Sequence, residues 1–320
     1  HLVAAREAAA LVVRSQTAST WATSLIAANH DGQAALGLSR ATVSGNPEDR
    51  LHVLFRQKNA TMGSSPYHSW RKAAAGGTWS TPVGLTGVTV DSVEIGGADK
   101  FLYATSTVSS PRQLLAWSLV WGGSSYTATP LPSLTAPVYH PRLAVGPSAW
   151  VSSYFADVGG GIFRWQLQSS SHGGGTPTAS SLSATSTKDP APIVIDTAGI
   201  VHGVVTRPSG TSGATLHYFK WDRASAPQEQ TLISTASVEH GTADLALDPA
   251  GRPHIVYVSA GILRELHWTG TSWSLSAALA QAPSPLATRI AIDPGGKFMH
   301  VAFTSYVAHW DVSYLRCYTP

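Results

Sequence analysis

The sequence predicts an all-β fold, a six-bladed β-propeller, from three observations. A unit of four short strands recurs at a spacing of roughly 40 to 50 residues, which is typical of propeller blades. Gly, Pro, Ser and Thr collect between the strands, whereas β-branched and aromatic residues collect within them. Tryptophan or tyrosine also returns at two fixed places in the unit. Because one such sheet leaves two faces and two edges open, the copies must pack against one another.

The clearest copy of the unit is Leu245 to Ala280. It reads as the strands LALD, HIVYV, ILRELHW and WSLSAAL, and the turns between them contain Gly251, Gly261 and Gly270. We expect one antiparallel sheet per copy, with its first strand nearest the propeller axis.

Six copies follow one another, at approximate residues 36–85, 88–134, 137–183, 188–235, 238–281 and 285–320. The last copy lacks a fourth strand. Residues 1–29 hold an arm or short helix and then the strand TWATSLIA, in which Trp21 corresponds to Trp273 of the fifth copy. We expect this strand to complete the last blade and close residues 1–320 into one domain, because a closed ring has no free edges.

Composition limits the possible functions. The 21 Lys and Arg residues exceed the 18 Asp and Glu residues by too little to form the basic surface that nucleic acids require. No apolar run reaches the roughly 18 residues that cross a bilayer. The low charge content, the Ser/Thr/Gly-rich surface and the start at His1 favour a secreted or periplasmic bacterial protein. We expect no cofactor.

Four histidines, His52, His202, His254 and His300, begin the second strand of their copies. Histidine clusters bind metals, but equivalent positions in different blades lie too far apart to share an ion with bonds of about 2.0 Å. We therefore expect no metal, and four histidines that lie between blades and are hydrogen-bonded separately.

Aromatic residues recur late in the third strand and at the start of the fourth. We expect these aromatic side chains to be buried between blades; the alternative is that they form a stacking platform for sugars. The third-strand set is Trp70, Trp117, Trp165, Trp221, Trp268 and Tyr318, and the fourth-strand set is Trp21, Trp79, Tyr126 and Trp273.

The innermost strands provide a candidate ligand site. Alignment of ATVS, VEIG, LAVG, IVID, LALD and IAID places one residue before each motif near the axial mouth. Three of these residues are arginines, whose guanidinium groups suit a carboxylate, sulfate or phosphate. The alternative is structural pairing, with Asp244, with backbone carbonyls or with one another's blades. The aligned residues are Arg40, Ser92, Arg142, Pro192, Asp244 and Arg289.

Tyr139, His140 and His240 precede these positions and are the candidate catalytic residues. His240, next to Glu239 and near Asp244, is the best placed acid or base. A polysaccharide lyase uses a His or Tyr base with arginine neutralising the substrate carboxylate, and these residues fit that chemistry. A glycosidase needs two carboxyls about 5 to 9.5 Å apart, and few acidic residues lie near the mouth, namely Asp91, Asp189, Glu239 and Asp244.

The segment DPAGRPHIVYVSAGILRELHWTGTSWS resembles the repeats of secreted bacterial propellers of the sialidase-like and lectin-like type. For a sialidase, the resemblance implies a carboxylate-binding triad at Arg40, Arg142 and Arg289. The family's Ser-x-Asp-x-Gly-x-x-Trp turn is absent, since TGTSW and AGGTW keep Gly and Trp without Asp. The chain is also similar to six-bladed fucose lectins in length and tryptophan content, although their repeated glutamate does not recur.

These observations favour a secreted, lectin-like propeller that binds a glycan or a small anionic ligand at an arginine-lined axial site. A carbohydrate-active enzyme, with a lyase preferred over a sialidase-type glycosidase, is the alternative. A structural or protein-interaction scaffold is the third hypothesis, because a fold alone does not fix a function.

Overall fold

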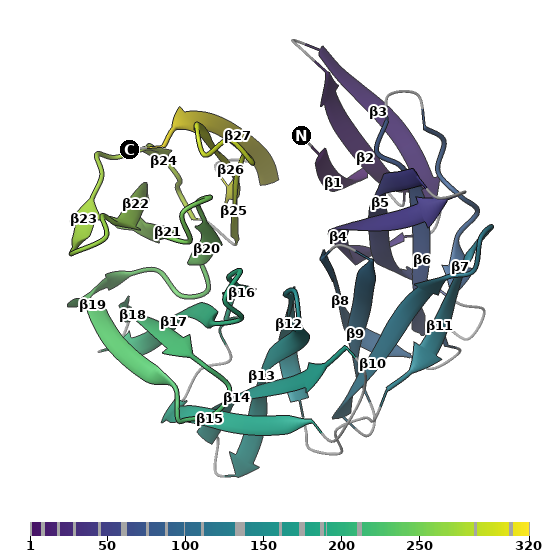
Figure 1. Ribbon diagram of the computed structural model, residues 1–320. Coiled ribbons are helices and arrows are strands. Elements are labelled where there is room, and N and C mark those ends of the chain that lie inside the picture. The colour runs from purple at the N-terminus through teal and green to yellow at the C-terminus, as the bar shows by residue number, and fades with distance from the viewer. Residues whose placement is uncertain are drawn as a thin grey trace. The chain divides into compact units, whose positions relative to one another are not determined.

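The computed structural model confirms the all-β prediction (Figure 1). In the part of the chain that it describes, every regular element is a β-strand, so no helix is present that could span a membrane. The described residues are 2–7, 10–17, 20–27, 30–43, 46–58, 63–74, 77–86, 89–98, 100–109, 112–131, 138–159, 162–172, 177–185, 189, 191–209, 213–284, 287–306 and 310–319.

The chain divides into two compact units, His1–Trp150 and Val151–Pro320. In the first unit, three sheets of successive strands precede β12 (Val138–Val145). They consist of β1 (Leu2–Glu7), β2 (Ala10–Thr17) and β3 (Thr20–Ala27); β4 (His30–Val43), β5 (Asn46–Lys58), β6 (Ser64–Lys72) and β7 (Val83–Gly84); and β8 (Val90–Ala98), β9 (Phe101–Ser109), β10 (Arg112–Trp121) and β11 (Tyr126–Pro130).

The second unit continues the pattern. Its first strands are most of β13 (Ala149–Gly159), within which the division falls, β14 (Ile162–Ser171) and β15 (Thr178–Thr185); together with β12 they pair in the order β12-β13-β14-β15. Next come β16 (Ile193–Ile195), β17 (Val201–Ser209), β18 (Gly213–Trp221) and β19 (Gln228–Val238); then β20 (Asp244–Leu247), β21 (Pro253–Ser259), β22 (Ile262–Trp268), β23 (Trp273–Leu275) and β24 (Ala280–Gln281); and then β25 (Thr288–Ile292), β26 (Phe298–Tyr306) and β27 (Trp310–Tyr318). The sheets β16–β19 and β20–β24 are joined into one nine-stranded sheet at a single pair, Val238 opposite Ser259.

Successive sheets pack face to face within each unit. In the second unit, Leu216 and Tyr218 of β18 share a buried cluster with Leu245, Ile255 and other residues of the next sheet. The first strands also neighbour one another, since β20 contacts both β16 and β25. In the first unit β8 contacts β4 and β12 in the same way. This is the packing of propeller blades, in which each sheet buries its faces against its neighbours.

The N-terminal residues form a three-stranded sheet of their own in the first unit. Thr20–Ala27 pairs with β2, from Thr20 opposite Thr17 to Ala27 opposite Leu11, and so forms the edge of a three-stranded sheet. Residues 2–7 and 10–17 are strands and not a helix. Completion of the last blade by Thr20–Ala27 stays a prediction. Pairing between neighbours along the chain costs far less loop-closure entropy than pairing between the two ends.

The register of the first copy also differs from the predicted alignment. His254 lies opposite Ala246, and His202 lies opposite Val194, but His52 lies opposite Gly37. The segment equivalent to LALD is therefore LGLS, residues 36–39, and not ATVS. Arg40 follows this segment instead of preceding it.

Candidate functional site

The second-strand histidines each hydrogen-bond to the third strand of their own sheet. The Nδ1–H of His254 donates to Oε1 of Glu265 at 2.7 Å. His202 Nδ1 lies 2.5 Å from the Tyr218 hydroxyl, and the other two pairs are His300 with Tyr314 at 2.7 Å and His52 with His68 at 3.0 Å. Each histidine has its own partner within its sheet, which confirms the expectation that the four are hydrogen-bonded separately.

For His202 and His52, a residue in or directly after the first strand supplies a second polar partner. His202 Nε2 lies 3.2 Å from Asp196, whose other oxygen accepts the N–H of Ile200 at 2.8 Å. In the first copy Ser39 takes the aspartate's place, with its hydroxyl 2.8 Å from His52 Nε2. These two histidines therefore join the first strand, or the turn after it, to the second and third strands. Among the described residues, no group of three or more His, Cys, Asp or Glu side chains is arranged to hold a metal.

The candidate ligand-binding arginines contact protein acceptors. Arg40 pairs with Asp49 at 2.7 Å on an exposed surface, and by the corrected register its place in the alignment belongs to Ala35. Arg142 forms a largely buried ion pair with Glu94 of β8. Arg289 donates to the carbonyl of Thr288 at 2.8 Å.

Asp244 links two first strands, because its Oδ2 accepts the backbone N–H of Ile290 at 2.9 Å. Together with the arginine contacts, this is the structural pairing that the sequence left open as the alternative. A ligand role for Arg40, Arg142, Arg289 and Asp244 stays a prediction.

His240 contacts a different carboxylate from those expected. Its Nδ1 lies 2.7 Å from Asp189 Oδ2, which also accepts the hydroxyl of Thr206 at 2.9 Å. Glu239 instead accepts the N–H of Gly261 at 2.8 Å. The other two candidates, Tyr139 and His140, lie on β12 in the first unit. His140 has a φ of 46°, an uncommon backbone conformation for a residue other than glycine.

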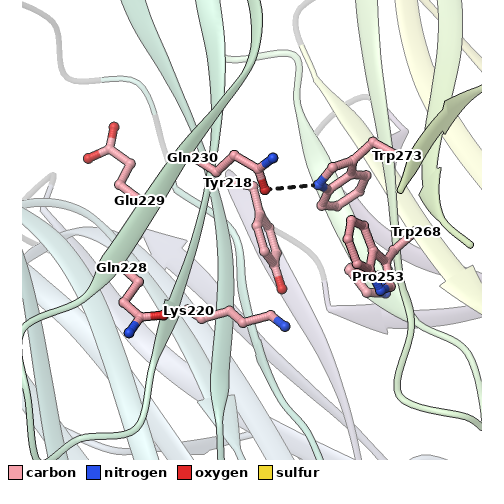
Figure 2. Close-up of a pocket in the computed structure, with 8 residues that line it drawn as sticks. All are labelled: Tyr218, Lys220, Gln228, Glu229, Gln230, Pro253, Trp268 and Trp273. Atoms are coloured by element: carbon pink, nitrogen blue, oxygen red, sulfur yellow. Dashed lines mark hydrogen bonds between the residues drawn. The ribbon is translucent and has the colours of Figure 1, made fainter. Parts of the chain in front are cut away.

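A pocket of about 310 Å³ lies between the sheet β16–β19 and the following sheet (Figure 2). Strand periodicity explains its lining, because residues two apart on a strand share a face. Tyr218 and Lys220 of β18 face it in this way, as do Gln228 and Gln230 of β19. Pro253, Trp268 and Trp273 lie on the opposite side, and Glu229 completes the lining.

The aromatic side of this pocket is rigidly built. Trp268 and Trp273 are cross-strand partners, and their ring centroids lie 5.7 Å apart at 64°. Tyr218 packs edge-on against Trp273 at 5.0 Å, and burial raises the pKa of its phenol. Trp273 Nε1 donates to Oε1 of Gln230 at 3.2 Å, as Figure 2 shows. The Tyr218 hydroxyl also hydrogen-bonds to His202, so this histidine helps to position the ring of Tyr218 in the pocket.

Two charged side chains line the pocket, and they differ in their contacts. Glu229 is bound by Arg207 at 2.7 and 2.9 Å and by His217 at 3.1 Å. Its carboxylate points away from the other labelled side chains in Figure 2. Lys220 is exposed and forms no ion pair with any residue that the structure describes.

A second pocket of about 240 Å³ adjoins the first. Lys220 and Gln228 line both. The rest of its lining is mostly polar, namely Asp196, His202, Asp222 and Ser225, with Ile200 and Ala226. The two tryptophans of the first pocket stand out in the sequence by their recurrence, whereas Lys220 and Gln230 do not. An alternation of Tyr218 and Lys220 on one strand face was the available signal.

No known protein family matches the chain, and no curated protein matches its sequence. Solved structures do match its fold. A six-bladed fucose-specific lectin from the fungus Aleuria aurantia is similar over 88% of this chain and 94% of its own, with 12% identity and a TM-score of 0.52. The hydrazine synthase of Kuenenia stuttgartiensis covers 98% of this chain and 90% of its own, with 10% identity and a TM-score of 0.59.

A structure of NanB is similar over 88% of this chain and 67% of its own, with 10% identity and a TM-score of 0.51. Identities this low carry information about the fold alone. They agree with the face-to-face packing of successive sheets, and the protein is an all-β propeller.

Proposed function

We propose that this protein binds a carbohydrate and that the pocket between β18–β19 and β21–β23 is the binding site. The observation that carries the proposal is the pair of partly exposed tryptophans, Trp268 and Trp273, facing the amide of Gln230 and the ammonium of Lys220 across one pocket. The C–H face of a sugar ring packs on indole, and its hydroxyls bond to amide and ammonium groups. A few polar groups in an apolar pocket are the usual composition of a ligand site.

The fold-level likeness to a fucose-specific lectin supports the proposal, because it shows that a propeller of this size can present sugar sites. We include six blades in the proposal: the strands from β4 to β27 group into six sets that follow the repeats of the sequence, with β1–β3 as an additional sheet. Secretion belongs to it as well, supported by the low charge content.

A glycan array with the full chain, followed by calorimetric titration of the bound glycan, tests this function. Trp268→Ala should weaken binding at least about tenfold, because it removes the stacking surface, worth on the order of 1.4 kcal/mol. Trp268→Phe should retain most of the affinity. Leu275→Ala, a change at an exposed residue on β23, is the control and should bind as the parent does. An array without binding, or equal affinities for all variants, would refute the proposal.

A second candidate function rests on His240 and Asp189. A carboxylate that holds an imidazole through Nδ1 leaves Nε2 to accept a proton, which is the arrangement of a general base. A polysaccharide lyase would use such a base. New unsaturated sugar ends that disappear in His240→Ala would support it, whereas binding without turnover would leave the lectin function alone.

A further inference from the structure

The two adjacent pockets form one groove with a lysine at the junction. Lys220 and Gln228 belong to the lining of both pockets, and both residues are exposed. The side chain of Lys220 extends toward the side of Pro253 and Trp268 in Figure 2. Its ammonium group therefore faces the aromatic pocket.

The charge of Lys220 is available to a ligand, unlike the other charges nearby. Glu229 is held by Arg207 and His217, and hydrogen bonds and charge from these two residues lower the pKa of its carboxyl against the effect of burial. Lys220 makes no comparable contact with a described residue. The aromatic pocket thus combines a stacking surface with one uncommitted positive charge.

The second pocket has the opposite character. Asp222 Oδ1 accepts the N–H groups of Ala224 and Ser225 and the Ser225 hydroxyl, all within 3.0 Å, and these hydrogen bonds lower the pKa of its carboxyl. Asp196 also lines this pocket. Two carboxylates accept sugar hydroxyls but repel a further carboxylate.

We propose that the ligand is an acidic oligosaccharide, with a carboxylate-bearing sugar in the aromatic pocket and a neutral sugar in the second pocket. The acidic ring packs on Trp268 and Trp273, and its carboxylate meets the Lys220 ammonium. The neutral ring donates hydroxyls to Asp196 and Asp222. This inference rests on the proposed carbohydrate function and adds the chemical class of the sugar.

Matched titrations test the inference. The first comparison is between glucuronic acid and glucose, which differ at one carboxylate. The second is between three disaccharides: one with a uronic and a neutral unit, one with two uronic units and one with two neutral units. The parent protein should prefer the acidic over the neutral sugar roughly fivefold, which is the scale of one partly exposed ion pair. The mixed disaccharide should bind most tightly. Raising NaCl from about 0.05 M to about 0.5 M should remove the preference for acid and leave the binding of glucose unchanged.

Lys220→Gln should abolish the acidic preference while glucose still binds, and Lys220→Arg should retain it. Lys297→Gln makes the same charge change on a lysine of the same unit outside the groove lining, and should behave as the parent. Unchanged thermal unfolding of each variant shows that it is folded. Equal binding of acidic and neutral sugars in the parent, or a preference that survives Lys220→Gln, would overturn this inference alone. Absence of binding for both sugars would overturn the carbohydrate function with it.

Discussion

Glu265 and His254 form a buried hydrogen-bonded pair, with 2.7 Å between Oε1 and Nδ1 and only 2% of each residue exposed. Glu265 Oε2 also accepts the hydroxyl of Ser276 at 2.8 Å, so both carboxylate oxygens are used. The pair joins β21 to β22, the strand that ends at Trp268. Its first role is to hold the sheet that forms one side of the groove.

Glu265→Leu should therefore lower the free energy of unfolding by about 3 kcal/mol, because a buried histidine N–H and the Ser276 hydroxyl lose their acceptor. Glu265→Gln keeps an acceptor oxygen and should cost about 1 kcal/mol. Chemical denaturation of the full chain measures both changes. Equal losses in the two variants would show that volume, and not hydrogen bonding, explains the effect.

The buried pair His52 and His68 makes the protein sensitive to acid. Burial lowers the pKa of His68 from 6.5 to about 4, and burial also lowers the pKa of His52 well below its usual range. The unfolded chain then binds a proton near pH 6.5, whereas the folded protein does not until about pH 4. The contribution of the buried, neutral His68 to the free energy of unfolding is therefore fully present above pH 6.5. It falls by about 3 kcal/mol as the pH drops toward 4.

Denaturant midpoints measured from pH 7.5 to pH 4.5 test this expectation. Replacement of His68 by Gln should lower stability at neutral pH, because the bond to His52 is altered, but should flatten the pH dependence. Carboxyls with lowered pKa values, such as that of Asp31, also contribute to the free energy of unfolding, but their contribution is lost mainly below this pH range. A pH profile that is the same in the parent and in His68→Gln would contradict the assignment.

Gly203 marks a position where the sheet packs without room for a side chain. A Cβ built there would lie 2.1 Å from the ring of Phe219, which is fully buried. Gly203→Ala should lower the free energy of unfolding by about 2 kcal/mol or more, since the ring cannot move aside in a filled core. Gly122→Ala, where the nearest atom would lie 3.6 Å away, is the matched control and should be nearly neutral. Thermal unfolding compares the two.

The sequence predicted the strands well because their signals are local. Turns such as those around Gly251 and Gly261, both with positive φ, are specified by the few residues that can adopt that backbone conformation. The burial of Trp117 and Trp221 likewise followed from their recurrence. These features depend on short segments and on a repeat, and a single sequence contains both.

Register and side-chain partners were harder to predict. LGLS and ATVS have the same alternation of apolar residues, so hydrophobicity does not show which of them is equivalent to LALD. The hydrogen bond between Ser39 and His52 identifies LGLS as the equivalent segment. The strands of residues 2–17 are rich in alanine, which obscured their extended pattern. Lys220 is one of 21 basic residues, and only the packing of two sheets reveals that its charge faces a groove.

Arg142 and Arg40 provide the test that separates structural pairing from ligand binding. The ion pair of Arg142 with Glu94 is less than one fifth exposed on each side, so Arg142→Ala leaves a poorly solvated carboxylate and should cost about 2 to 3 kcal/mol of unfolding free energy. Arg40 and its partner Asp49 are about half exposed, and Arg40→Ala should cost less than about 1 kcal/mol.

Neither substitution should change the affinity for a sugar if the groove around Lys220 is the binding site. Calorimetric titration alongside denaturation measures both properties on the same samples. A loss of sugar binding in Arg142→Ala with unchanged stability would instead place the ligand at the axial arginines, because only a residue that contacts the ligand changes affinity without changing the fold.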